Sequence, residues 1–200
     1  MRIALIPAFE PDLKLVNTAR GLCETGFEVV IVNDGSGCRY HEVFEEAAAY
    51  GAVLSYRENR GKGAVLKDGL RYIRQHYQPP YTVVTVDADG QHKTADAVRC
   101  CREAERKPEA LILGSRREDA EQVRVPLRSR FGNALTRQVF WIRTGASVYD
   151  TQTGLRAFSD RLVPPLLNIS GDRYEYAACL CGPETADCGD SGFKNLYQWK

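Results

Sequence analysis

Short apolar runs alternate with amphipathic stretches over the first two-thirds of the chain. Continuous apolar and β-branched runs predict buried strands at residues 3–8, 27–32, 53–56, 81–86 and 110–113. Apolar residues at helical spacing predict helices at residues 13–22, 43–48, 64–76 and 94–106. Strands that are apolar on both faces, with amphipathic helices between them, are typical of a parallel sheet covered on both sides. We therefore expect an α/β fold, a Rossmann-like three-layer α/β/α sandwich with a mostly parallel central sheet.

Three polar loops directly follow predicted strands. They are residues 33–37, 59–63 and 87–92. The carboxyl ends of parallel strands meet at one edge of a sheet, and ligands of such folds bind beyond that edge. We therefore expect these three loops to form one binding site.

Asp87 and Asp89 stand two residues apart, just after an apolar strand. Side chains alternate in an extended chain, so the two carboxylates can point the same way. Clustered oxygen ligands suit Mg²⁺ or Mn²⁺, which would hold the phosphates of a nucleotide, and Gln91 or His92 could add a ligand. A turn with capping aspartates also produces this pattern by chance. The preceding strand favours the metal site.

The other two loops carry weaker signals. Asp34 can accept a hydrogen bond from a base N–H, although a plain Asx turn would account for the same residues. The segment 60–63 (Arg-Gly-Lys-Gly) opens a predicted helix and offers backbone N–H groups and an ammonium to an anion. It is not a P-loop, and no Gly-x-Gly-x-x-Gly follows the first strand, which disfavours a nicotinamide or flavin dinucleotide.

The segment 123–149 has no acidic residue and five arginines, Arg124, Arg128, Arg130, Arg137 and Arg143. Apolar residues in the same segment fit one helix face. The arginines form either a solvated face or a phosphate-attracting pocket or membrane-facing helix. The sequence leaves both interpretations open.

The chain has 200 residues, enough for one ordinary domain. Its 27 Lys and Arg nearly balance its 26 Asp and Glu, which disfavours a general nucleic-acid binder. It shows no signal peptide and no run of about 18 to 20 apolar residues that could span a membrane. The seven cysteines fit free thiols in a reducing compartment. We expect a cytoplasmic protein, peripheral at most to the inner face of the membrane.

Several motifs then occur in a characteristic order. They are Ile6–Glu10, Val32–Ser36, Asn59–Gly63, Val86–His92 and Gly114–Arg116, extended by Asp150–Phe158 and Gly171–Tyr176. In this order they resemble family 2 glycosyltransferases, and are most similar to dolichyl- or polyprenyl-phosphate mannosyl- and glucosyltransferases. The resemblance covers residues 1–176. It implies a GT-A fold and an inverting transfer of a hexose from a UDP- or GDP-linked sugar, with Mg²⁺ or Mn²⁺ as cofactor and a polyprenyl phosphate or glycan as acceptor.

The resemblance also implies roles for individual residues. The nucleotide-sugar site would comprise Pro7, Ala8, Glu10, Asp34, Gly61, Lys62 and Asp87, with Asp34 recognising the base. Asp87, Asp89 and Gln91 would hold the metal. The catalytic group would be Asp89, Asp150, Arg116 and Arg130, and the acceptor phosphate would meet Arg116, Arg130 and Arg156. A lipid-phosphate acceptor is already anionic, whereas a hydroxyl acceptor would need Asp150 as general base.

The end of the chain departs from this pattern. We expect a nucleotide-sugar half at about 1–115, an acceptor half at about 116–176, and a divergent, poorly ordered tail at 177–200. Family members continue with further helices and strands, so a truncated or frameshifted end is one hypothesis. The alternative function is accordingly a catalytically impaired remnant that still binds a nucleotide sugar.

Overall fold

The computed structural model describes residues 1–114 and 154–171, together with the backbone of residues 196–199. Its strands are β1 (Arg2–Ala8), β2 (Glu28–Asn33), β3 (Ala52–Ser55), β4 (Thr82–Thr85), β5 (Leu111–Gly114), β6 (Arg156–Ser159) and β7 (Leu196–Trp199). Its α-helices are α1 (Lys14–Glu24), α2 (His41–Ala47), α3 (Lys62–His76), α4 (Thr94–Arg106) and α6 (Val163–Asn168). Short 3₁₀ turns, η1 (Cys38–Tyr40) and η2 (Asp160–Leu162), lead into α2 and α6.

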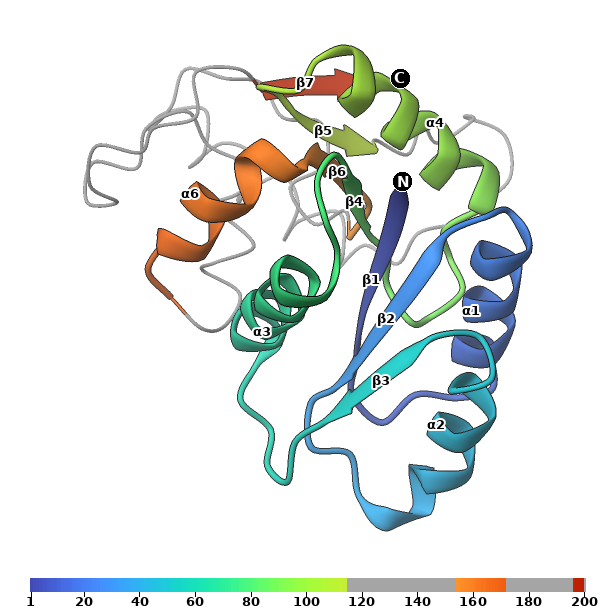
Figure 1. The fold of residues 1–200 in the computed structure, drawn as a ribbon. Helices are drawn as coiled ribbons and strands as arrows, with labels where there is room; N and C mark the ends of the chain where they lie inside the picture. The colour runs from blue at the N-terminus through green and yellow to red at the C-terminus, as the bar shows by residue number, and fades with distance from the viewer. Residues whose placement is uncertain (115–153, 172–195, 200) are drawn as a thin grey trace, which may run out of the picture.

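The strands form one sheet in the order β3-β2-β1-β4-β6-β5-β7 (Figure 1). The pairs β1–β2, β1–β4, β2–β3 and β5–β7 are parallel, with Ile6 opposite Ile31 in the central pair. Only β6 runs antiparallel to its neighbours β4 and β5 among the described strands. The prediction of a mostly parallel sheet is confirmed.

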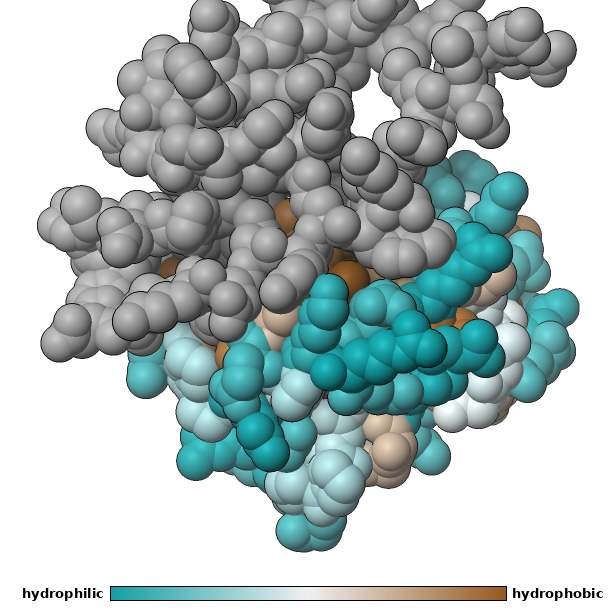
Figure 2. Space-filling model, turned by 90° about the horizontal axis from the view of Figure 1, so that it is seen from above, coloured by the Kyte–Doolittle hydropathy of each residue, from teal (hydrophilic) through white to brown (hydrophobic). Residues whose placement is uncertain are grey.

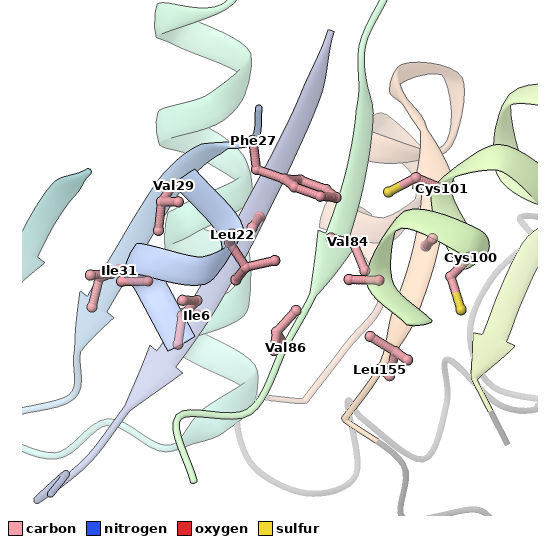
Figure 3. Close-up of a cluster of buried hydrophobic side chains, with 14 of the residues drawn as sticks. Ile6, Leu22, Phe27, Val29, Ile31, Val84, Val86, Cys100, Cys101 and Leu155 are labelled. Atoms are coloured by element: carbon pink, nitrogen blue, oxygen red, sulfur yellow. The ribbon is translucent and has the colours of Figure 1, made fainter. Parts of the chain in front are cut away.

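Helices cover both faces of this sheet, with α1, α2 and α4 on one side and α3 and α6 on the other (Figure 1). The alternation of side chains along β1 serves both layers, because Ala4 and Ile6 face the first group of helices whereas Ile3 and Leu5 face the second. Figure 3 shows the first layer, in which strand residues pack against Leu22 of α1 and the cysteines of α4. The three-layer α/β/α prediction is therefore confirmed.

All nine predicted strands and helices are present, with ends displaced by a few residues at most. Two described strands and one helix were not predicted. The strand β6 inserts between β4 and β5, and α6 follows it through η2. A run of only four residues that begins with Arg156 and ends with Ser159 carries little hydrophobic pattern, although all four side chains are buried.

The tail also differs from its expectation at one place. Residues 196–199 form the edge strand β7, which pairs in parallel with β5, where the sequence predicted a tail without strand periodicity. Pairing with a formed strand supplies the backbone hydrogen bonds, so a four-residue edge strand needs little pattern of its own. The other tail residues and the arginine-rich segment 123–149 lie outside the described residues.

None of the helices that the structure describes is long and apolar enough to cross a bilayer. Seen from above, the described part of the surface is mostly hydrophilic (Figure 2). Its exposed large hydrophobic side chains are Met1, Phe9 and Leu13, in the described ranges.

Candidate functional site

A cleft of about 280 Å³ opens where β1 and β2 end and α3 begins. It is lined by Pro7, Ala8, Phe9, Asp34, Asn59, Gly61, Lys62 and Val65. Two of the three polar loops thus meet at this edge of the sheet, as predicted. The third joins them through Lys62, which lines the cleft and contacts Asp87.

Asp34 fastens the loop that precedes α3. Its side chain is buried, and its two carboxylate oxygens accept the backbone N–H groups of Arg60 at 2.7 Å and Gly61 at 3.0 Å. Gly35 lies against the backbone of Glu58, so closely that a Cβ there would collide with it. Two of the amides that the sequence offered to a ligand anion, those of Arg60 and Gly61, are therefore bound by Asp34, at the positive end of the α3 dipole.

Arg60 holds the same loop from the other side. Its guanidinium donates to Asp68 of α3 at 2.7 Å and lies over the ring of Tyr56, 4.9 Å from its centroid. Asp68 is also paired with Arg71. Burial raises the pKa of the Tyr56 hydroxyl, and its hydrogen bond to Asp68 raises it further. Arg60 thus helps to hold the loop in place, and this loop brings Lys62 to the cleft.

Asp87 lies between two nitrogen-bearing side chains. Its Oδ1 accepts a hydrogen bond from Lys62 Nζ at 2.6 Å, and its Oδ2 lies 3.5 Å from His92 Nε2. Burial alone would raise the pKa of this carboxyl, but the contact with His92 and the charge and hydrogen bond of Lys62 outweigh burial and hold the pKa well below its usual range. Asp87 is therefore an anion at neutral pH.

Gly154, just before β6, covers the Asp87 carboxylate. A Cβ at position 154 would overlap all three carboxyl atoms of Asp87. The carbonyl of Gly154 accepts a hydrogen bond from the buried hydroxyl of Thr85 at 2.7 Å, which fixes the glycine over the end of β4. The predicted acceptor half and the predicted nucleotide half of the chain thus touch at Asp87.

Asp89 is exposed and shapes the loop after β4. Its Oδ1 accepts the backbone N–H of Gln91 at 3.0 Å, in the Asx turn that the sequence left as an alternative. Gly90 in this turn has φ of 71°, in the left-handed region that favours glycine.

The donor set fits a divalent cation bound together with a nucleotide. The described residues contain no group of three or more His, Cys, Asp and Glu side chains placed to hold a metal. Mg²⁺ is ordinarily bound by one or two carboxylates with substrate phosphates completing its shell. Asp87 is one carboxylate of this loop, and Asp89 and Gln91 follow it as exposed residues joined by a hydrogen bond, so the predicted metal ligands stay a prediction.

Not all of the residues predicted for the nucleotide site line the cleft. Pro7 and Ala8 line the cleft as expected, but Glu10 does not: it has φ of 48°, and its carboxylate lies 3.5 Å from Arg39. Phe9, which is 51% exposed, lines the cleft instead. The sequence could have indicated Phe9 as a cleft residue, because it is an aromatic residue next to Pro7 and Ala8.

Arg156, a predicted acceptor ligand, is buried within the sheet. It lies within β6, opposite Thr85 and Leu113, and is only 2% exposed. A side chain that meets a phosphate has to be reachable, and the predicted contact of Arg156 with an acceptor stays a prediction. The three other predicted residues of the acceptor half, Arg116, Arg130 and Asp150, lie outside the described residues.

Comparison with protein families gives a match over most of the chain. The sequence profile described as Glycosyl transferase family 2 matches residues 4–163. The chain is 29% identical over 177 residues to an uncharacterized protein of Methanocaldococcus jannaschii, covering 87% of this chain and 71% of that protein. It is 23% identical over 214 residues to the UDP-N-acetylglucosamine–dolichyl-phosphate N-acetylglucosaminyltransferase of Methanococcus voltae, covering 96% of this chain and 84% of that enzyme.

Solved structures share the fold. Glucosyl-3-phosphoglycerate synthase from Mycobacterium tuberculosis, in complex with Mn²⁺, UDP-glucose and phosphoglyceric acid, superposes with a TM-score of 0.71 at 16% identity, over 99% of this chain and 68% of that one. A mannosyltransferase from Pyrobaculum calidifontis, in complex with GDP-mannose and Mn²⁺, gives 0.55 at 17% identity, over 90% of this chain and 51% of that one. These neighbours are GT-A glycosyltransferases, which confirms the predicted fold class.

Proposed function

This chain belongs to glycosyltransferase family 2, and on that premise we propose that it transfers a hexose from a UDP- or GDP-linked sugar to a polyprenyl phosphate with inversion at the anomeric carbon. The cleft between Asp34 and Lys62 takes the nucleotide, and Asp87, Asp89 and Gln91 hold a divalent cation at its diphosphate. The single observation that carries the proposal is the cleft itself: it lies at the carboxyl edge of the sheet, with Asp34 and the Lys62 ammonium on its wall and the Asp87 carboxylate bonded to that ammonium.

The charges of this site suit a departing diphosphate. When the bond between the anomeric carbon and the diphosphate oxygen breaks, negative charge grows on the nucleotide and positive charge on the sugar. A bound Mg²⁺ or Mn²⁺ would neutralise part of that negative charge. Lys62 adds a positive charge from the wall of the cleft, held in place by Asp87 before the donor arrives.

The loop before α3 fixes the nucleotide side of the cleft. Asp34 binds the backbone of Arg60 and Gly61 and still has lone pairs for a base N–H, since each carboxylate oxygen can accept twice. Base recognition by Asp34 and positioning of the loop are therefore compatible roles.

A lipid phosphate is the acceptor that fits best. It is anionic at neutral pH, so its oxygen can attack the anomeric carbon without a general base, and it needs positive charge for docking. Arg116 and Arg130 are our candidates to supply that charge. The relative from Methanococcus voltae, a dolichyl-phosphate N-acetylglucosaminyltransferase, supports this choice. Such an acceptor would bring the protein to the cytoplasmic surface of a membrane. A hydroxyl acceptor would instead give Asp150 the role of base.

A transfer assay tests the proposal. The protein is incubated with sugar-labelled UDP- and GDP-hexoses, a short polyprenyl phosphate and Mn²⁺, and the label extracted into butanol is counted. We expect label on the lipid from one donor series, lost when EDTA is added or when Asp89 is replaced by alanine. Donor binding without transfer to any acceptor would contradict catalysis and favour the nucleotide-sugar-binding remnant.

A further inference from the structure

The imidazole of His92 lies beneath the carboxylate of Asp87. The His92 side chain is 4% exposed, and its Nε2 lies 3.5 Å from Asp87 Oδ2. Nε2 is buried and makes no hydrogen bond at this distance, so the neighbouring Asp87 carboxylate is the polar group that offsets its burial.

The loop after β4 reverses direction, and this brings His92 back to Asp87, five positions earlier in the chain. Asp89 accepts the N–H of Gln91, and Gly90 adopts a left-handed conformation, so the chain reverses between them. At Gly90 a Cβ would stand 3.2 Å from the Lys14 side chain, which closes the outer side of the turn. The turn thus returns the chain so that His92 lies beside Asp87, which follows β4.

Asp87 is enclosed on three sides as a result. Lys62 binds Oδ1, His92 stands at Oδ2, and Gly154 covers the carboxyl group with no room for a side chain. Rotation of the carboxylate away from Lys62 would leave His92 Nε2 buried without its anionic neighbour. Among the described residues, Asp87 is the carboxylate with which His92 pairs.

We propose that His92 is a positioning residue: it fixes the Asp87 carboxylate so that Oδ1 faces Lys62 and the donor cleft. The positioning of Asp87 by His92 does not depend on the proposed function. Its expected effect, tighter binding of the metal–nucleotide donor, does rest on the proposed function. Groups that orient a metal ligand from behind typically change metal affinity by about 10- to 100-fold when they are removed.

Two amide substitutions separate this role from simple packing. Glutamine at position 92 can carry an N–H to the place of Nε2, whereas asparagine is one methylene shorter and reaches only the place of Nδ1. His92→Gln and His92→Asn therefore have matched chemistry and differ in reach. The control is His76→Asn, because His76 is exposed at the far end of α3 and binds the Tyr72 carbonyl.

The first readout needs no ligand. Lys62 is acetylated with a low concentration of an N-hydroxysuccinimide ester, and its rate relative to Lys107 is followed by peptide mass spectrometry. The hydrogen bond to Asp87 holds the Lys62 ammonium against the carboxylate and away from the reagent. We expect His92→Asn to speed acetylation of Lys62, because a carboxylate that is free to turn releases the Lys62 side chain to the reagent. His92→Gln and the control should resemble the wild type.

The second readout is the affinity for Mn²⁺ with UDP or GDP, followed by the electron paramagnetic resonance of free Mn²⁺. We expect His92→Asn to weaken it by about 10- to 100-fold and His92→Gln by less than about threefold. Unchanged Lys62 acetylation in His92→Asn, or an equal increase in both variants, overturns the positioning role. A wild type that binds neither nucleotide overturns the proposed function, while the acetylation rates still decide the role of His92.

Discussion

Gly154 packs directly on the carboxylate of Asp87, although the two residues are 67 positions apart in sequence and belong to the two predicted halves of the chain. Thr85 holds the glycine there through its buried hydrogen bond to the Gly154 carbonyl. The orientation of the Asp87–Lys62 ion pair therefore depends on the segment that leads into β6.

Gly154→Ala is expected to displace Asp87. The added methyl has to overlap the carboxylate or push the chain off β4, and overpacking of this kind costs about 1–3 kcal/mol. Donor binding should weaken together with the free energy of unfolding, measured by nucleotide titration and urea denaturation. The control is Gly37→Ala, because a Cβ at residue 37 meets nothing within 4 Å. Equal donor affinity in both variants would show that the packing against Asp87 does not matter.

Asp89→Ala is expected to abolish metal-dependent activity while leaving the fold intact. Asp89 is exposed, so its loss should change the free energy of unfolding by no more than about 0.5 kcal/mol. Loss of metal binding removes several kcal/mol of transition-state stabilisation, or about two orders of magnitude or more in rate.

Asp89→Asn distinguishes the metal from the turn. Asparagine keeps an oxygen for the Gln91 N–H but carries no charge. The metal role predicts that Asn is as inactive as Ala in the transfer assay. Recovery of activity in Asn would mean that Asp89 acts through the turn alone.

Asp34→Ala should impair both the loop and the donor. The amides of Arg60 and Gly61 would lose their acceptor, at about 1–3 kcal/mol for each group left unsatisfied. We expect the donor KM to rise more than kcat falls, because the cleft loses its wall while the reacting groups remain. Steady-state kinetics over a range of donor concentrations measures both. A fall in kcat at constant KM would contradict this assignment.

Most of the fold could be predicted from the sequence because its central strands are apolar on both faces. Ile3 to Ile6 serves two helical layers at once, and such a run is typical of a strand in the middle of a covered parallel sheet. The strand β6 lacked such a signal, since its ends are Arg156 and Ser159 and its burial comes from neighbours more than 40 residues away in sequence.

The sequence predicted which residues lie at the site better than it predicted what each of them contacts. Asp34 was identified, but its carboxylate binds amides 26 and 27 positions later, and no local pattern shows that contact. The sequence suggested His92 only as a further ligand, whereas it is buried under Asp87. A motif names residues without showing which way they face: Glu10 lies beside Arg39, and Arg156 is buried within β6.

The low pKa of Asp87 gives a pH dependence of stability. A carboxyl whose folded pKa lies below its unfolded value of about 3.9 adds stability at higher pH and loses it as pH falls toward the folded pKa. Urea unfolding at pH 7 and pH 3 should therefore show Asp87→Asn less stable than the wild type at pH 7, with a smaller difference at pH 3. The half-buried Asp96→Asn, whose carboxylate pairs only at 3.7 Å with the exposed Arg99, should differ by less than about 0.5 kcal/mol at both. A difference for Asp87→Asn that grows toward pH 3 would contradict the ion pair.

Calorimetric titration of the protein with UDP and with GDP, in Mn²⁺ and again in EDTA, tests the central claim most directly. We predict that one nucleotide binds in Mn²⁺ and that its affinity falls by at least about tenfold in EDTA, because carboxylates and phosphates share the cation. Binding that is equally tight without the metal, or no binding of either nucleotide, would contradict a metal–nucleotide site beside Asp87.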